Sequence, residues 1–308
     1  DHAVARVIES SLGVLVDGIS SVLIGKRDQV QLAVSCVLAG GHLLIEDRPG
    51  MGKSTLAEAT ACAFGLAFKR VSFTSDLLPA DLIGINVFDP GTTEFRFKPG
   101  PIFTQVLLAD EINRASPRTQ SALLEAMAAS RVSVDGISHS LPQPFVVIAT
   151  QNSLDQVGTS PLPEAQLDRF LMRIHLGFPD RQAERALLKN TSLTIAEISS
   201  GLDPAALMSL QQQCRQQHTS GLLLDYVLDL VEASRGAGVG LSPRASQGLL
   251  AAARAWSLLQ GRDHVRIDDV QAVFPSVAEH RLDSGALADH SGGSPLSQTV
   301  LQKVNALR

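Results

Sequence analysis

The sequence predicts an α/β domain built on a parallel sheet, followed by a smaller all-helical domain. The first observation is a set of five short apolar runs, separated by segments with helical spacing, which is typical of strands covered on both faces. The runs lie at residues 42–46, 68–73, 105–109, 145–150 and 171–176. The second observation is a change after Pro179-Asp180, beyond which helical patterns dominate. We therefore predict domains at residues 1–180 and 181–308.

The elements before and within the sheet follow from local signals. Residues 1–40 predict two helices with a short break at 22–26, and Gly40-Gly41 ends the second helix. Lys69 and Arg70 interrupt the second apolar run, which favours a place at the edge of the sheet.

Two segments interrupt the simple alternation of strands and helices. Residues 76–101 are rich in Gly, Pro and Asp, and residues 131–144 contain two short strand patterns around Asp135-Gly136. An Asp-Gly pair between strand patterns is a strong hairpin signal. We expect both segments to be insertions into the α/β domain.

Helix starts in the second domain are marked by cap residues before proline. Asp203-Pro204 and Ser242-Pro243 each combine a preferred N-cap with proline at the first helical position. Residues 281–308 carry Ser284-Gly285 and Ser291-Gly292-Gly293-Ser294-Pro295, which predict a tail that is loosely structured or a linker before a last helix.

Composition excludes several classes of protein. The 308 residues are 44% hydrophobic and carry a net charge of −5, and no apolar run approaches the ~20 residues of a membrane span. Nucleic-acid binding needs a basic surface, which the negative net charge disfavours, and single strands need stacking aromatics, which make up only 4% of the chain. Nucleic acid is therefore an unlikely partner. Three widely spaced cysteines without metal-ligand spacing fit a reducing, cytoplasmic location.

A phosphate-binding loop is predicted at residues 46–55, between a strand and a helix. Its nucleotide-binding residues are Pro49, Gly50, Met51, Gly52, Lys53, Ser54 and Thr55. Glycines let backbone N–H groups approach phosphates, and the helix start adds partial positive charge. Lys53 would reach the β- and γ-phosphates of ATP, and the Ser54 hydroxyl would bind Mg²⁺. The strict pattern has glycine where this chain has Asp47, which we interpret as variation at a permissive position.

Asp110 and Glu111 end the third apolar run and supply the acids that such a loop needs. In a parallel sheet they would lie at the same edge as the loop. Asp110 would hold Mg²⁺ and contact the nucleotide site, and Glu111 would act as general base on the attacking water. Two solvated acids after a strand are the simpler alternative, which the phosphate loop upstream disfavours.

Several ordered motifs together resemble the MoxR family of AAA+ ATPases. They are the segment Asp110-Glu111-Ile112-Asn113-Arg114-Ala115-Ser116-Pro117 and its continuation to Met127, Ala149-Thr150-Gln151-Asn152, Leu162-Pro163-Glu164-Ala165-Gln166-Leu167-Asp168-Arg169-Phe170, Gly240-Leu241-Ser242-Pro243-Arg244-Ala245 and Gly261-Arg262-Asp263. The resemblance covers roughly residues 20–283. It implies a P-loop NTPase core of the AAA+ class with a five-stranded parallel sheet and a helical lid domain.

The resemblance also implies roles for further residues. Asn152 matches sensor 1, which orients the attacking water, and Arg169 matches the arginine finger, which reaches the ATP of a neighbouring subunit. Arg244 matches sensor 2, which we expect to act in cis from the lid. Arg114 is a weaker candidate for the subunit interface at which Arg169 would act. The two insertions would face the central pore of a ring.

The family further implies a function and its partners. Members are chaperone-like ATPases that form rings, commonly hexamers, and act with a von Willebrand factor A domain protein to mature a client or insert its cofactor. Three alternatives stay open: a nucleic-acid-directed AAA+ motor, a magnesium-chelatase-type subunit, and a scaffold that binds ATP without turnover.

Overall fold

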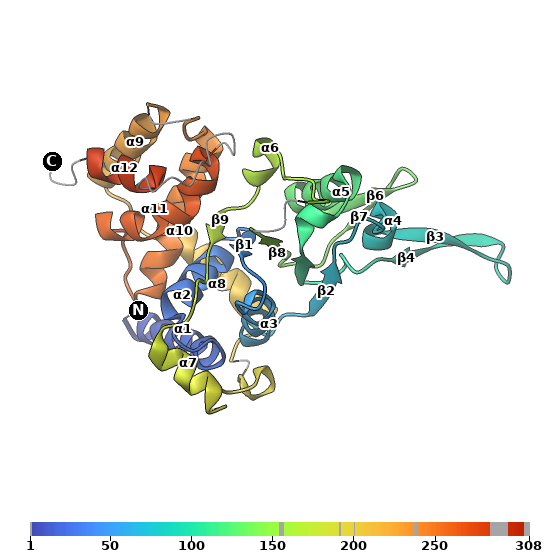
Figure 1. Cartoon of the computed structure of the whole chain (residues 1–308), viewed down its shortest axis with the longest axis horizontal. Helices are drawn as coiled ribbons and strands as arrows, with labels where there is room; N and C mark the ends of the chain where they lie inside the picture. Colours follow the sequence, from blue (N-terminus) through green and yellow to red (C-terminus); the bar gives the residue numbers. More distant parts are fainter. Residues whose placement is uncertain are drawn as a thin grey trace.

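The computed structural model describes residues 2–153, 157–190, 192–199, 201–236, 239–283 and 295–304. A five-stranded parallel sheet forms the centre of the first domain (Figure 1). Its strands are β1 (Leu43–Asp47), β2 (Phe68–Ser72), β5 (Val106–Asp110), β8 (Val146–Asn152) and β9 (Met172–Ile174), in the order β2-β5-β8-β1-β9. The predicted sheet and all five predicted strands are confirmed, and β2 lies at an edge as Lys69 and Arg70 indicate.

Helices cover both faces of this sheet. They are α1 (His2–Val22), α2 (Arg27–Leu38), α3 (Lys53–Ala63) and α5 (Pro117–Ala129), with the short helices η1 (Ile112–Arg114), α4 (Pro79–Ile83) and α6 (Glu164–Leu167). Side chains alternate along a strand, so Leu43 and Ile45 belong to the core cluster with α1 to α3, while Leu44 belongs to the cluster under α5. This burial on both faces explains why the strands are continuous apolar runs.

The two predicted insertions are hairpins. Strands β3 (Gly84–Asp89) and β4 (Glu94–Pro99) form an antiparallel arm that extends away from the body of the molecule (Figure 1). Strands β6 (Arg131–Val134) and β7 (Ile137–Ser140) form the second hairpin. Its turn residues Asp135 and Gly136 both have positive φ, +49° and +78°, as a two-residue hairpin turn requires.

Beyond residue 180 the described chain is helical. The elements are α7 (Arg181–Leu188), η2 (Ile195–Glu197), α8 (Pro204–Gln216), α9 (Gly221–Arg235), α10 (Pro243–Leu259), α11 (Ile267–Leu282) and α12 (Leu296–Lys303). Asp203 and Ser242 cap α8 and α10 as predicted, each accepting a backbone N–H. Helix α10 packs on α2 and α11, which joins the helical domain to the core cluster on one face of the sheet.

Two predictions from the sequence are not tested by the described residues. The Ser-Gly pairs on which the tail prediction rests, at 284–285 and 291–294, lie outside the described residues, and the domain boundary near 180 stays a prediction. Among the described residues, none of the helices has the length and apolar character that crossing a membrane requires.

Candidate active site

The phosphate loop connects β1 to α3 at the carboxyl edge of the sheet. Gly50 and Gly52 have φ of +77° and +93°. Residues with a side chain rarely adopt this backbone conformation, which explains glycine at these two positions. Gly52 is the N-cap of α3 and has no side chain that would accept the first amides of the helix. The first turn of α3, which contains Lys53, Ser54 and Thr55, is therefore suited to bind an anion.

Lys53 lies between the ends of β1 and β8. Its Nζ donates hydrogen bonds to the Asp47 carbonyl oxygen at 2.8 Å and to the Gln151 carbonyl oxygen at 3.2 Å. Burial lowers the pKa of the Lys53 ammonium, and the nearby carboxylates, those of Asp47 and Asp110 among them, oppose the shift. The amine therefore lies among acids at the edge where a triphosphate and its cation would bind.

One hydroxyl connects the predicted magnesium ligand Asp110 to the backbone of the predicted general base Glu111. The Thr150 Oγ1 donates to Asp110 Oδ1 at 2.6 Å and accepts the Glu111 backbone N–H at 2.9 Å. Asp110 also pairs with the half-exposed Arg70, and Glu111 pairs with Arg114 at 3.2 Å. Glu111 has φ of +55°, a left-handed conformation that is uncommon for a residue with a side chain and that is concentrated at functional sites.

The residues present fit a magnesium ion held jointly with ATP. Mg²⁺ in nucleotide sites usually takes one or two protein oxygen ligands, with substrate phosphates and water completing its shell. Ser54, in the first turn of α3, and Asp110, at the end of β5, offer a hydroxyl and a carboxylate of this kind. Arg70 would have to release Asp110, and its side chain is 53% exposed and free to turn into solvent.

Asn152, the predicted sensor 1, is the last residue of β8 and is buried. It lies directly opposite Asp47 in the parallel register of β8 and β1. The structure therefore brings Asn152 to the same edge as Lys53 and Asp110, whereas its catalytic role stays a prediction.

Arg169 and Arg244 form a second group with Asp168. They line a cavity of about 270 Å³ that also includes Gly41, just before β1. Arg169 donates to the Leu124 carbonyl oxygen, and the Arg244 Nη1 lies 3.9 Å from Asp168 Oδ2. The Arg244 side chain is 64% exposed, so it is available to a group outside its own chain.

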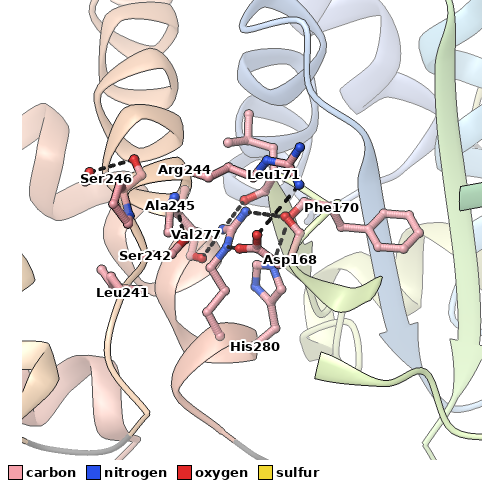
Figure 2. A network of polar contacts seen from close by, with 12 residues as sticks. Asp168, Phe170, Leu171, Leu241, Ser242, Arg244, Ala245, Ser246, Val277 and His280 are labelled. Atoms are coloured by element: carbon pink, nitrogen blue, oxygen red, sulfur yellow. Dashed lines mark hydrogen bonds and ion pairs between the residues drawn. The ribbon is translucent and has the colours of Figure 1, made fainter. Parts of the chain in front are cut away.

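Arg281, which sequence reasoning missed, supports this second group. Its buried guanidinium donates to Asp168 Oδ1 at 2.8 Å and to the carbonyl oxygens of Asp168, Phe170 and Leu171. Figure 2 shows Arg244 extending toward Asp168, Phe170 and Leu171 from the start of α10. Arg281 lies in the last turn of α11, and no local motif distinguishes it.

In this arrangement Arg244 does not lie at the phosphate loop of its own chain, and its role in cis or in trans stays a prediction. Gly41 and the second group lie at the amino end of β1, whereas Lys53 and the phosphate loop lie at its carboxyl end. Arg244 reaches the amino end because α10 packs on α2, the helix that leads into β1. Within one chain Arg244 accompanies the predicted arginine finger, not the phosphate loop.

The fold and the site define a P-loop ATPase of the AAA+ class. Residues 42–172 match the family model described as the ATPase family associated with various cellular activities, and residues 232–303 match the AAA lid domain. The chain is 42% identical to the YeaC protein of Bacillus subtilis, over 88% of this chain and 86% of that protein. It is 38% identical to the chaperone MoxR1 of Mycobacterium tuberculosis, over 93% and 80% of the two chains. The chain belongs to the MoxR family of AAA+ ATPases.

A solved structure agrees with this assignment. A crystal structure described as an ATPase, from Cytophaga hutchinsonii, superposes with a TM-score of 0.83 at 30% identity. The superposition covers 98% of this chain and 96% of the chain in the crystal structure. The similarity extends over both the sheet and the helical domain. The family and fold expected from the motifs are therefore confirmed.

Proposed function

We propose that the chain assembles into a ring, most simply a hexamer, and hydrolyses ATP with Mg²⁺ at sites shared between neighbouring copies. The observation that carries the proposal is the division of site residues between the two ends of β1. One end offers Lys53, Asp110 and Glu111, and the other offers Arg169 and Arg244. A head-to-tail contact between copies would bring the two halves together, and such contacts close into rings.

Each residue then has a distinct task in the shared site. Lys53 binds the β- and γ-phosphates, and Asp110 with Ser54 holds the magnesium ion. Glu111 removes a proton from the attacking water, which Asn152 orients. The place of Lys53 and Ser54 in the first turn of α3, and the general requirements of phosphoryl transfer, support these tasks.

Arg169 and Arg244 would both come from the neighbouring subunit. Two guanidinium groups aimed at the γ-phosphate stabilise the charge of the transition state, and one arginine finger contributes about 10³–10⁵ in turnover in other NTPases. Arg281 holds Asp168 and the start of β9 in place, so that Arg169 and Arg244 are presented together.

The work driven by hydrolysis is, in this proposal, chaperone-like remodelling of a client protein with a von Willebrand factor A domain partner in the cytoplasm. The tip of the β3–β4 arm supports a client contact. Phe88 and Phe95 are 49% and 71% exposed, and their rings pack edge to face at 5.4 Å. Exposed aromatic side chains on a projecting arm are suited to grip an apolar segment of a partner.

The test of the ATPase is turnover as a function of magnesium, ATP and protein concentration. We expect the rate per subunit to rise with concentration as rings assemble. Lys53→Ala should lose nucleotide binding, and Glu111→Gln should bind ATP without hydrolysis. Arg169→Ala should lose turnover, while the matched control Arg27→Ala, an exposed arginine paired with Asp17, should keep it. A concentration-independent rate would contradict the shared site.

The test of the remodelling role uses the same Glu111→Gln variant, which holds ATP. It should capture a von Willebrand factor A domain protein encoded by the same genome, and ATP should strengthen the capture. Exchange of Phe88 and Phe95 for serine should weaken binding of the client without changing basal turnover. Capture that ignores both ATP and these two side chains would count against the proposal.

A further inference from the structure

Asp47 occupies the position where a strict phosphate loop has glycine, and its carboxylate makes contacts far along the chain. The Asp47 Oδ2 accepts the backbone N–H groups of Leu176 and Gly177, both at 2.8 Å, and Oδ1 accepts the Arg48 N–H at 2.9 Å. Leu176 and Gly177 belong to segment 175–178, which follows β9 and leads to the start of α7. The side chain therefore joins the phosphate loop to the entry of the helical domain.

The same segment is held from its other side by Lys26. The buried Lys26 Nζ donates to the carbonyl oxygens of Leu176 at 2.6 Å and Phe178 at 2.9 Å. Asp47 accepts from two amides and Lys26 donates to two carbonyl oxygens, so two oppositely charged side chains hold four backbone groups of this short segment. Charge-assisted hydrogen bonds of this kind are roughly twice as strong as neutral ones.

Two more contacts fasten segment 175–178 to the end of β1. The His175 Nδ1 lies 2.6 Å from the Glu46 carbonyl oxygen, and the Arg48 guanidinium lies over the Phe178 ring, 5.6 Å from its centre. Beyond the segment, α7 packs closely on the turn before α2, where a Cβ on Gly25 would come within 2.7 Å of the Ala183 Cβ. Segment 175–178 therefore connects the end of β1 to a helix that is itself packed on the turn before α2.

Asp47 also contacts the lysine that binds phosphate. Its main-chain oxygen accepts the Lys53 Nζ at 2.8 Å, while its side chain holds Leu176 and Gly177. One residue thus connects the phosphate-binding amine to segment 175–178. A glycine at this position would keep the contact to Lys53 and lose the contact to the segment.

We propose that Asp47 is a positioning residue that couples the phosphate loop to α7 through the amides of Leu176 and Gly177. The coupling rests on the proposed function, because it makes the helical domain respond to ATP bound at Lys53. Backbone amides offset part of the charge of Asp47, because Oδ1 accepts one N–H and Oδ2 accepts two from residues outside the loop. Asp47 therefore connects the phosphate loop to segment 175–178, and this role replaces its interpretation as variation at a permissive position.

Burial and hydrogen bonding act in opposite directions on this carboxyl group. Burial alone would raise the pKa of Asp47, but the amides of Gly177, Arg48 and Leu176 outweigh it, and the pKa lies below its usual value. The group is thus held as a carboxylate, the form that accepts all three hydrogen bonds.

The test is hydrogen exchange measured by mass spectrometry without nucleotide, comparing the unmodified chain with Asp47→Gly and Asp47→Asn. Asp47→Gly should raise exchange in peptides covering 172–178 by at least about tenfold, which corresponds to 1.4 kcal/mol. Asp47→Asn, which keeps an acceptor but not the charge, should give a smaller rise of several fold. The control is Asp89→Gly, because Asp89 also ends a strand and accepts a backbone N–H, that of Gly91, but lies in the β3–β4 arm.

Coupling is tested in the Glu111→Gln background with ATP and Mg²⁺. ATP should protect α7 from exchange in this parent, and adding Asp47→Gly should abolish the protection of α7 while ATP still binds. Exchange at 172–178 that stays within about twofold of the unmodified chain in both Asp47 variants, as in the control, would overturn the proposal. A parent that binds no ATP would instead overturn the proposed function, since the exchange without nucleotide is independent of it.

Discussion

Acidification should destabilise the folded chain through His42, which is held in its neutral form. The His42 Nδ1 accepts the Val147 backbone N–H at 2.9 Å, so Nε2 carries the proton and faces the Met127 carbonyl oxygen at 3.3 Å. Protonating Nδ1 would place two donors against each other. Burial lowers the pKa of His42 to about 4, although the contact to Met127 opposes the shift.

The sign and size of the effect follow from the two pKa values. The folded pKa lies below the unfolded value of about 6.5, so the unfolded chain binds more protons and stability is lost as pH falls below 6.5. Between pH 7 and pH 5 the loss from His42 is about 2 kcal/mol. His280 is also buried, and burial lowers its pKa well below the usual value. It therefore also reduces the stability of the folded chain as the pH falls.

The assay is urea unfolding at pH 7, 6 and 5, followed by circular dichroism and by the single tryptophan, Trp256. His42→Gln should be less stable at pH 7 but should lose about 2 kcal/mol less than the unmodified chain between pH 7 and pH 5. Arg27→Met, at an exposed position that involves no histidine, is the control and should show the same loss between pH 7 and pH 5 as the unmodified chain. If His42→Gln showed the same pH dependence as the unmodified chain, the reasoning about a neutral His42 would be refuted.

Three further outcomes are expected. Thr150→Val removes the hydroxyl that connects the Asp110 carboxylate to the Glu111 backbone N–H. It should lower kcat about 10-fold or more with little change in the Kd for ATP, measured by steady-state turnover and nucleotide binding. Arg281→Met removes the buried partner of Asp168, whose own side chain is 27% exposed, and the donor to the carbonyl oxygens of residues 168, 170 and 171, so it should cost about 1–3 kcal/mol in thermal or urea unfolding. Arg27→Met on the surface should cost at most about 1 kcal/mol. Phe95→Ser should change the free energy of unfolding by at most about 0.5 kcal/mol and basal turnover by less than about twofold, because the ring is 71% exposed on the arm. A large loss of either would show a different role for the arm.

The sheet and the phosphate loop were predictable because their signals are local. Strands buried on both faces must be continuously apolar, and Gly50 and Gly52 are required where φ is positive. The Asp135-Gly136 hairpin is likewise specified by two adjacent residues. The position of Asp110 at the same edge as the loop follows from the parallel order of the strands.

The arrangement of the arginines was not predictable, because it depends on long-range packing. Arg244 is placed by α10 packing on α2, and nothing within the Ser242-Pro243-Arg244 motif specifies that contact. Arg281 bonds Asp168 and Leu171, which lie more than a hundred residues earlier in the chain. The role of Asp47 was missed for the same reason, since the amides that it accepts come from residues 176 and 177.

The central claim is that Arg244 serves the ATP of a neighbouring subunit, and complementation between two inactive variants tests it most directly. Lys53→Ala lacks phosphate binding but keeps Arg244, and Arg244→Ala keeps the phosphate loop. Each should be inactive alone. Co-expressed in equal amounts, they should regain turnover at about a quarter of the sites, where an intact loop meets an intact arginine of the next copy. Mixed rings that form but stay inactive would place Arg244 at the ATP of its own chain and contradict the account.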